Sequence, residues 1–292
     1  MLSKDELTNA CLLADLSELA YKPQSEIQAV LPSLNLSFED FFNDPTSGTQ
    51  GFLAKNERAA FLLFRGTERD KPEDVIVDLL AWPASHPSGK VHAGFQFAFN
   101  SVKSAVEKHF QKLQDFPVPV YVGGHSLGGS LAVLAAAYMI DKNIPVAGLY
   151  TFGQPRVGNA KFEKHYAPLI VENYYRFTNA QDLFPHVPPC FMGYRHLGES
   201  SYHFSDDGKL GKSSSRWEWI VESAFILFAA YRKSEKIRDF VHKLIRRNPK
   251  ESEALKLSAK EASKDFFKIF KCNIVDDHDM KTCYIKNLKK NQ

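Results

Sequence analysis

One stretch near the middle of the chain constrains its fold more than any other. An apolar, β-rich run at residues 118–122 leads into Gly124-x-Ser126-x-Gly128, and an alanine-rich run follows at residues 131–139. A strand that ends at this pattern and is followed at once by a helix puts the serine in a strained turn that exposes its hydroxyl. The flanking glycines avoid collisions across so sharp a turn. The stretch therefore predicts a strand, a nucleophile-bearing turn at Ser126 and a helix.

Strands and helices alternate around this turn. The pattern predicts a hairpin over 51–64, a helix over 95–113, a helix over 131–140, a strand over 146–152, a helix over 159–169 and a strand over 171–178. Such alternation is typical of a mostly parallel sheet with helices on both faces. Functional residues in these sheets gather beyond the carboxyl ends of the strands.

Asp182 follows the second predicted strand after Ser126. By itself an aspartate in this position is more often a turn former or a helix cap. Its place in the chain changes that reading, because an α/β-hydrolase triad runs in the order serine, acid, histidine. Asp182 is therefore the candidate acid.

Composition limits the classes of function. The chain has 292 residues, 44% hydrophobic and 24% charged, enough for a sizeable core in one domain spanning residues 1–292. A net charge of +3, without a basic stripe interleaved with aromatics, does not indicate nucleic-acid binding. The four cysteines are scattered and form no metal pattern; they are Cys11, Cys190, Cys272 and Cys283. We expect no metal and no organic cofactor.

The first residues predict a helix rather than a targeting signal. Ser3 and Glu6 have the spacing of a capping box, and apolar residues follow at helical intervals. A cleavable signal would need a basic segment followed by an apolar one. We expect a cytoplasmic protein, with membrane association or export by another route left open.

Several motifs together resemble one family. They are Phe64-Arg65-Gly66-Thr67, the run 91–95, the turn 124–129, the run 150–159, and Asn179-Ala180-Gln181-Asp182 with the tail 187–189. In this order, over about residues 45–205, they resemble the fungal-type, class 3 lipases. The resemblance implies an α/β-hydrolase fold and cleavage of carboxylic esters, mainly of acylglycerols or phospholipids.

The resemblance also implies roles for individual residues. Ser126 would attack the acyl carbon, and Asp182 would orient the histidine and stabilise its charged form. The oxyanion hole would use the backbone N–H of Leu127 and that of Thr67. Without the family, Thr67 reads as a turn residue at a strand end.

The catalytic histidine is the open choice among five that follow the acid, namely His186, His196, His203, His242 and His278. His186 is too close to Asp182 in the chain to fold back, and His242 lies in a basic helical stretch. His278, in the run 275–285, resembles the late histidine of the family and is our first choice. His196 is the second choice. The long stretch before His278 departs from the family pattern.

Two further segments bear on lipid contact. Residues 68–90 carry an apolar stripe after Pro72 and predict a lid over Ser126, or a fixed surface helix. Residues 211–271 predict a helical insertion. Its part 214–250 combines bulky apolar residues with a basic amphipathic pattern, which indicates peripheral membrane contact or a helical hairpin packed on the sheet.

These observations predict a serine carboxylic-ester hydrolase that forms an acyl-enzyme on Ser126 and acts on a lipid ester. One alternative is a catalytically weak membrane-binding or interaction protein on a lipase scaffold, although the intact site residues argue against it. Another is a lipid acyltransferase, which differs only in the nucleophile that resolves the acyl-enzyme. The sequence does not predict the oligomeric state.

Overall fold

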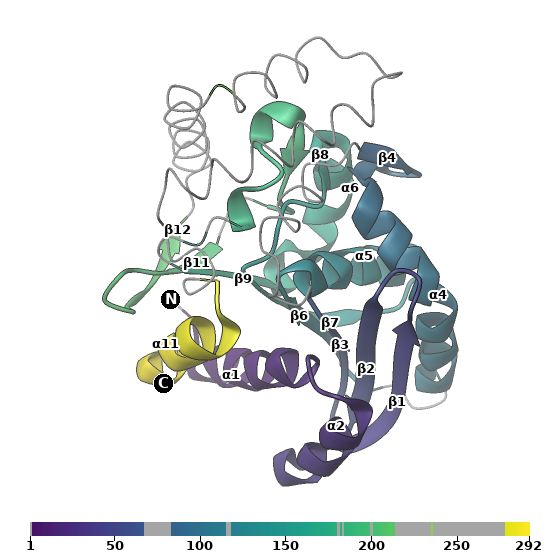
Figure 1. The fold of residues 1–292 in the computed structure, drawn as a ribbon, viewed down its shortest axis with the longest axis vertical. Coiled ribbons are helices and arrows are strands. Elements are labelled where there is room, and N and C mark those ends of the chain that lie inside the picture. Colours follow the sequence, from purple (N-terminus) through teal and green to yellow (C-terminus); the bar gives the residue numbers. More distant parts are fainter. Residues whose placement is uncertain are drawn as a thin grey trace.

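The computed structural model centres on one large β-sheet. It describes residues 2–66, 83–114, 118–179, 182, 184–198, 201–213, 235 and 278–292. Within these ranges eight strands form the sheet seen in Figure 1. From one edge to the other they are β1 (Ser37–Asp44), β2 (Thr49–Lys55), β3 (Ala60–Phe64), β6 (Val120–His125), β7 (Val146–Phe152), β9 (Tyr174–Asn179), β11 (Ser201–Phe204) and β12 (Leu210–Ser213).

The middle of this sheet is parallel and its edges are antiparallel. β3, β6, β7, β9 and β11 run in one direction. β1, β2 and β12 pair antiparallel with their neighbours, and β2 with β3 forms the predicted hairpin. Parallel neighbours need crossover connections, which here contain helices. The predicted mostly parallel sheet is confirmed.

The helices in the described ranges lie around this sheet. They are α1 (Lys4–Leu19), α2 (Gln24–Val30), α4 (Ala93–Gln114), α5 (Leu127–Asp141), α6 (Ala160–Ile170) and α11 (Lys286–Asn291). A π-helical turn, η6 (Met280–Ile285), leads into α11. Short 3-10 turns are η1 (Leu31–Leu34), η2 (Val171–Asn173), η3 (Phe184–His186) and η4 (Cys190–Met192).

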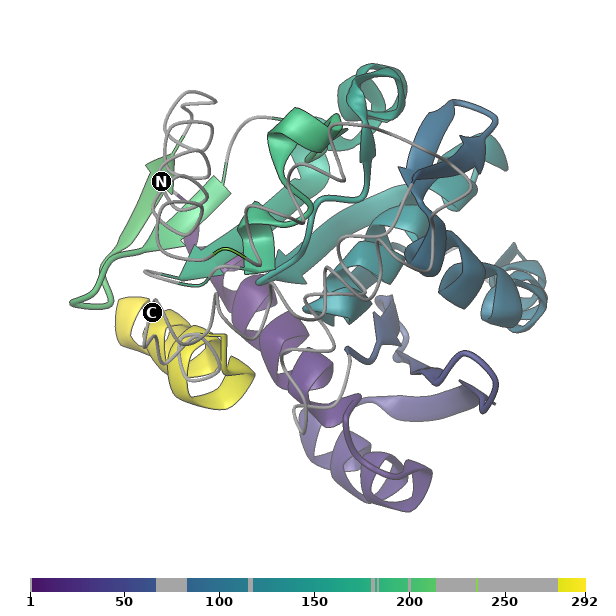
Figure 2. The ribbon, with the colours of Figure 1, turned by 45° about the horizontal axis from the view of Figure 1, so that its top comes forward.

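Helices cover both faces of the sheet, as predicted. Along β3, Leu62 and Phe64 join an apolar cluster with side chains of α4 and α5. Phe61 and Leu63 point to the other face, where they join side chains of α1, η6 and α11. This alternation follows from the two-residue period of a strand. Figures 1 and 2 show α1 and α11 side by side, so the two ends of the chain cover the same face.

The amino-terminal helix begins at the predicted capping box. The Ser3 hydroxyl accepts a hydrogen bond from the Glu6 N–H at 3.2 Å, and the Glu6 carboxylate accepts one from the Ser3 N–H at 2.6 Å. These bonds satisfy backbone donors that the first helical turn leaves unpaired. At the other end of the chain, Lys289 forms an ion pair with Asp15 of α1 at 3.0 Å.

Among the element boundaries that differ from the sequence prediction, two have a clear physical reason. α5 begins at Leu127 rather than at residue 131, although glycines are poor helix formers. Its early start is a tertiary effect, because Gly128 lies directly against the backbone of Phe64. β9 begins at Tyr174 rather than Val171, which lies in η2 and is 41% exposed. A β-branched residue favours a strand only where neighbouring strands pack against it.

A second, smaller sheet lies beside the main one. In spatial order its strands are β10 (Tyr194–Arg195), β8 (Gly158–Asn159), β5 (Gly89–His92) and β4 (Pro83–His86). The β4–β5 hairpin packs on α6, where the ring of His86 meets Phe162 edge-on at 5.2 Å. Residues 83–90 of the predicted lid are thus part of this sheet. The rest of that segment, 68–82, lies outside the described residues.

The predicted insertion over 211–271 is described only in small part. Residues 211–213 complete β12, and the remainder apart from residue 235 lies outside the described residues. The same holds for the predicted membrane-contact segment 214–250. Where the chain is described, none of its helices is long and apolar enough to cross a membrane.

Candidate active site

Ser126 occupies a strained turn between β6 and α5. Its backbone angles are φ 57° and ψ −129°, a conformation that costs a non-glycine residue about 1–3 kcal/mol. A hydrogen bond from its N–H to the Phe152 carbonyl, at 2.9 Å, ties the turn to β7. The Ser126 side chain makes no capping bond to α5. The turn therefore holds a serine hydroxyl at the carboxyl edge of the parallel strands without using it in the helix cap.

The two glycines of the motif are required by close backbone contact. A Cβ on Gly124 would collide with the backbone of Gly128, and one on Gly128 would collide with the carbonyl of Phe64. Both distances would be well under 3.0 Å, which real Cβ atoms essentially never show. The predicted reason for these glycines is confirmed.

The oxyanion side of the site is described up to Gly66. Leu127 is the first residue of α5, so its N–H belongs to the helix donors that have no intrahelical acceptor. A Cβ on Gly66 would lie 3.2 Å from the Cβ of Ser126, which places this residue against the serine. Thr67 follows next in the chain and lies outside the described residues.

Asp182 lies just past β9 and is 2% exposed. Its Oδ1 accepts a hydrogen bond from the Phe184 N–H at 2.9 Å, and its Oδ2 accepts one from the Tyr284 hydroxyl at 2.6 Å. Burial raises the pKa of Asp182 well above its ordinary value, whereas these two donors lower it by stabilising the charged form. The Asp182 carboxylate is thus buried, and both of its oxygens accept hydrogen bonds.

His278 is the histidine that the fold brings to this acid. Its Nδ1 donates to Oδ2 of Asp182 at 2.8 Å, across 96 positions of sequence. The imidazole stacks on Phe184, with ring centroids 3.8 Å apart, and lies 4.4 Å from the ring of His125, the residue before Ser126. With Nδ1 carrying the proton, the neutral ring has its acceptor at Nε2.

Gly153 lets the end of β7 approach this pair. Its φ is +58°, and an added Cβ would lie 2.6 Å from Cε1 of His278 and 2.8 Å from Oδ2 of Asp182. Any side chain at this position would push the histidine and the acid apart.

His196, the second choice, has a different hydrogen-bond partner. It follows β10, and its Nε2 donates to the Pro185 carbonyl at 2.8 Å. Burial, together with the charges of Arg176 and Arg156, lowers the pKa of His196 well below its ordinary value. A buried imidazole kept neutral in this way is poorly suited to gain a proton during a reaction.

Three polar residues around His278 are not predicted from the sequence. They are Tyr284, which contacts the acid, and Tyr21 and His125, which are hydrogen-bonded to each other. Burial and the neighbouring Asp182 raise the pKa of Tyr284 well above its usual range, so the hydroxyl stays protonated and donates. Tyr21 belongs to no motif, whereas His125 lies in the turn 124–129 and Tyr284 in the run 275–285. No local pattern predicts that these three residues gather around His278.

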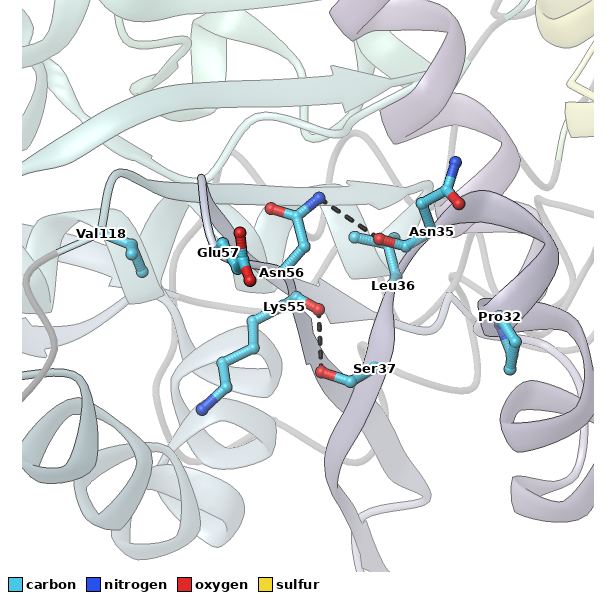
Figure 3. Close-up of a pocket in the computed structure, with 8 residues that line it drawn as sticks. All are labelled: Pro32, Asn35, Leu36, Ser37, Lys55, Asn56, Glu57 and Val118. Carbon is cyan, nitrogen blue, oxygen red and sulfur yellow. Dashed lines mark hydrogen bonds between the residues drawn. The ribbon is translucent and has the colours of Figure 1, made fainter.

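A surface cavity of about 540 Å³ lies near the amino end of β6, at the end of this strand opposite to Ser126 (Figure 3). It is lined by Pro32, Asn35, Leu36, Ser37, Lys55, Asn56, Glu57 and Val118. Val118 precedes β6, whereas Ser126 follows it, so the cavity is separated from the serine by the length of a strand. As for metals, the described part of the chain contains no group of three or more His, Cys, Asp or Glu side chains that could hold an ion.

Comparisons with known proteins agree with this geometry. Residues 61–192 match the family model described as lipase (class 3). A lipase of Rhizomucor miehei is 34% identical over 161 residues, which are 52% of this chain and 43% of that protein. A secreted mono- and diacylglycerol lipase of Fusarium solani is 37% identical over 124 residues, which are 42% of this chain and 36% of that protein. The chain thus spans less than half the length of these relatives.

A solved structure extends the likeness beyond the matched segment. A structure described as a serine protease triad that forms the catalytic centre of a triacylglycerol lipase aligns with 72% of this chain and 84% of its own. The identity is 26% and the TM-score 0.58. Together, the parallel sheet, the serine turn and the acid–histidine pair are the features of an α/β-hydrolase fold. Over residues 61–192 the chain is similar to the class 3 lipase family.

Proposed function

We propose that this protein is a serine hydrolase that cleaves carboxylic esters of acylglycerols through an acyl-enzyme on Ser126. The observation that carries the proposal is the 2.8 Å hydrogen bond between His278 and Asp182 beside the strained serine turn. The similar proteins, which are named as lipases and a mono- and diacylglycerol lipase, support the substrate class. Phospholipid esters are the second substrate class to be tested.

The first half of the reaction forms the acyl-enzyme. Ser126 Oγ bonds to the acyl carbon while its proton passes to Nε2 of His278. Asp182 stabilises the resulting imidazolium, an attraction made stronger by the burial of the carboxylate. His278 then gives the proton to the oxygen of the departing alcohol.

The second half releases the acid. Water attacks the acyl carbon and gives a proton to His278, which returns it to Ser126 Oγ as the ester bond to the enzyme breaks. In both halves, the N–H groups of Leu127 and Thr67 would stabilise the oxyanion. Losing one such donor typically costs about 3–4 kcal/mol.

Hydrolysis of short and long p-nitrophenyl esters tests the mechanism. We expect Ser126→Ala and His278→Ala to be inactive and His196→Ala, if folded, to remain active. A fluorophosphonate probe should label the wild type and not Ser126→Ala. Full activity of Ser126→Ala would refute the mechanism. An inactive, unlabelled and well-folded wild type would favour the binding-protein alternative.

A panel of natural lipids tests the substrate class. Mono-, di- and triacylglycerols and a phospholipid are offered as mixed micelles, and free fatty acid is measured. We expect fatty acid from the acylglycerols. Release from the phospholipid alone would move the proposal to a phospholipase. Acyl transfer to an added alcohol in preference to water would indicate an acyltransferase.

We also propose peripheral contact with lipid surfaces through residues 214–250. The support is the apolar and basic pattern of their sequence. In liposome flotation, the protein should float with vesicles that contain anionic lipid. If the protein floated equally well with neutral vesicles, this result would count against an electrostatic contact.

A further inference from the structure

A hydrogen-bonded chain connects the end of α1 to the backbone of His278. The hydroxyl of Tyr21, which follows α1, lies 2.8 Å from Nδ1 of His125. Nε2 of His125 lies 2.7 Å from the backbone carbonyl oxygen of His278. His125 is 1% exposed and is the last residue of β6, immediately before Ser126.

The chemistry of the partners sets the direction of this chain. A carbonyl oxygen can only accept, so Nε2 of His125 must carry a proton. In the neutral imidazole Nδ1 is then the acceptor, and Tyr21 donates to it. The order is Tyr21 O–H to His125, then His125 N–H to the carbonyl of His278.

The chain complements the hydrogen bond between Asp182 and His278. Asp182 holds the His278 side chain through Nδ1, whereas His125 holds the main chain of the same residue. The rings of His125 and His278 also contact each other, with centroids 4.4 Å apart and planes tilted by 35°. Since His125 is bonded covalently to Ser126, it links the backbone of the nucleophile to that of the histidine.

Tyr21 touches the oxyanion side of the site as well. A Cβ on Gly66 would collide with the Tyr21 hydroxyl and would lie 2.7 Å from the His125 carbonyl. The Tyr21 hydroxyl is therefore adjacent to the residue that precedes Thr67. Tyr21 thus lies against Gly66, which precedes the proposed oxyanion donor Thr67, and it is hydrogen-bonded to His125, which precedes Ser126.

We propose that Tyr21 and His125 are positioning residues for the hydrolytic reaction: through the His278 carbonyl they hold the imidazole in reach of Ser126. This inference rests on the proposed function. A misplacement of about 1 Å can cost about 100-fold in rate, so losing this restraint should lower kcat. Because the proposed role acts through the main chain of His278, KM should change little.

Four variants test the proposal with a soluble short-chain ester. His125→Leu removes both hydrogen bonds, and His125→Gln retains a donor that can reach the carbonyl. Tyr21→Phe removes only the hydroxyl. Tyr138→Phe is the matched control: it is also a half-buried tyrosine, and its hydroxyl donates to Glu107 at 2.6 Å. Tyr138 lies about 18 Å along α5 from Ser126.

We expect kcat to fall about 10- to 100-fold in His125→Leu and about 3- to 10-fold in Tyr21→Phe, with KM within about twofold of the wild type. His125→Gln should recover most of the activity. Tyr138→Phe should keep wild-type kcat even if its Tm falls as much as that of Tyr21→Phe. In the His125→Leu background, Tyr21→Phe should have little further effect, because its partner is already gone.

Wild-type kcat in Tyr21→Phe and His125→Leu would overturn the inference, as would losses that merely follow Tm in all four variants. If His125→Leu fails to fold, the comparison of Tyr21→Phe with Tyr138→Phe decides alone. Ser126→Ala distinguishes a failure of the proposed function from a failure of the positioning role. Activity that survives in Ser126→Ala refutes the proposed function. Activity that is lost there but unchanged in the Tyr21 and His125 variants refutes only the positioning role.

Discussion

Replacing Asp182 by asparagine should inactivate the protein by changing the tautomer of His278. Oδ1 of Asp182 accepts from the backbone N–H of Phe184, and Oδ2 faces Nδ1 of His278. Because the backbone N–H can only donate, the amide oxygen of asparagine must occupy the Oδ1 position. The amide NH₂ then faces Nδ1 and donates to it.

This orientation puts the imidazole proton on the wrong nitrogen. With Nδ1 accepting, the neutral ring carries its proton on Nε2 and cannot take one from Ser126. The equivalent change in a serine protease lowers kcat about 10⁴-fold. A loss of this size corresponds to about 5 kcal/mol in the activation barrier. Folding should be little affected, because the substitution removes a buried charge while the Phe184 bond remains and the Tyr284 hydroxyl can accept from the new NH₂ group.

Three measurements check this reasoning. Ester hydrolysis gives the loss of kcat/KM, thermal unfolding gives Tm, and nitrogen NMR of labelled histidine reports the tautomer of His278. We expect a loss of about 10³- to 10⁴-fold, a Tm close to that of the wild type, and a proton on Nε2. Activity above a tenth of the wild type, or a folded and inactive variant whose proton remains on Nδ1, would refute the tautomer argument.

Three further predictions concern the surroundings of the triad. Gly153→Ala should lose most activity, because its Cβ would lie 2.6 Å from His278 and its φ is +58°; wild-type kcat would contradict this. Tyr284→Phe should lower the free energy of unfolding by about 1.5–3 kcal/mol in urea titration, since it removes a hydrogen bond to a buried carboxylate; an unchanged midpoint would contradict this. Burial and the charge of Arg156 lower the pKa of His186 from 6.5 to about 3. Between these two pH values His186 is protonated in the unfolded chain and neutral in the folded protein, so the free energy of unfolding should fall as the pH falls. Urea midpoints at pH 7 and 4.5 should differ less in His186→Leu, and an equal difference would contradict this.

Much of the fold could be predicted because its signals are local. The strand, the turn at Ser126 and the following helix depend on residues next to one another, and the glycines act through backbone contact. The two-residue and helical periods indicated the alternating elements and hence the parallel sheet. The boundaries were less accurate, because the starts of α5 and β9 depend on packing and exposure that the local sequence does not contain.

The candidate site divides in the same way. The sequence by itself determined Ser126 and the place of Asp182 after a strand, since both follow from the order of elements along the chain. Only the tertiary structure decided that His278, rather than His196, meets the acid, because that contact joins residues 96 positions apart. It also brought Tyr284, Tyr21 and His125 to the same histidine. Hydrogen bonds between residues so distant in the chain produce no periodic pattern in the sequence. They form only when the two ends of the chain pack on one face of the sheet.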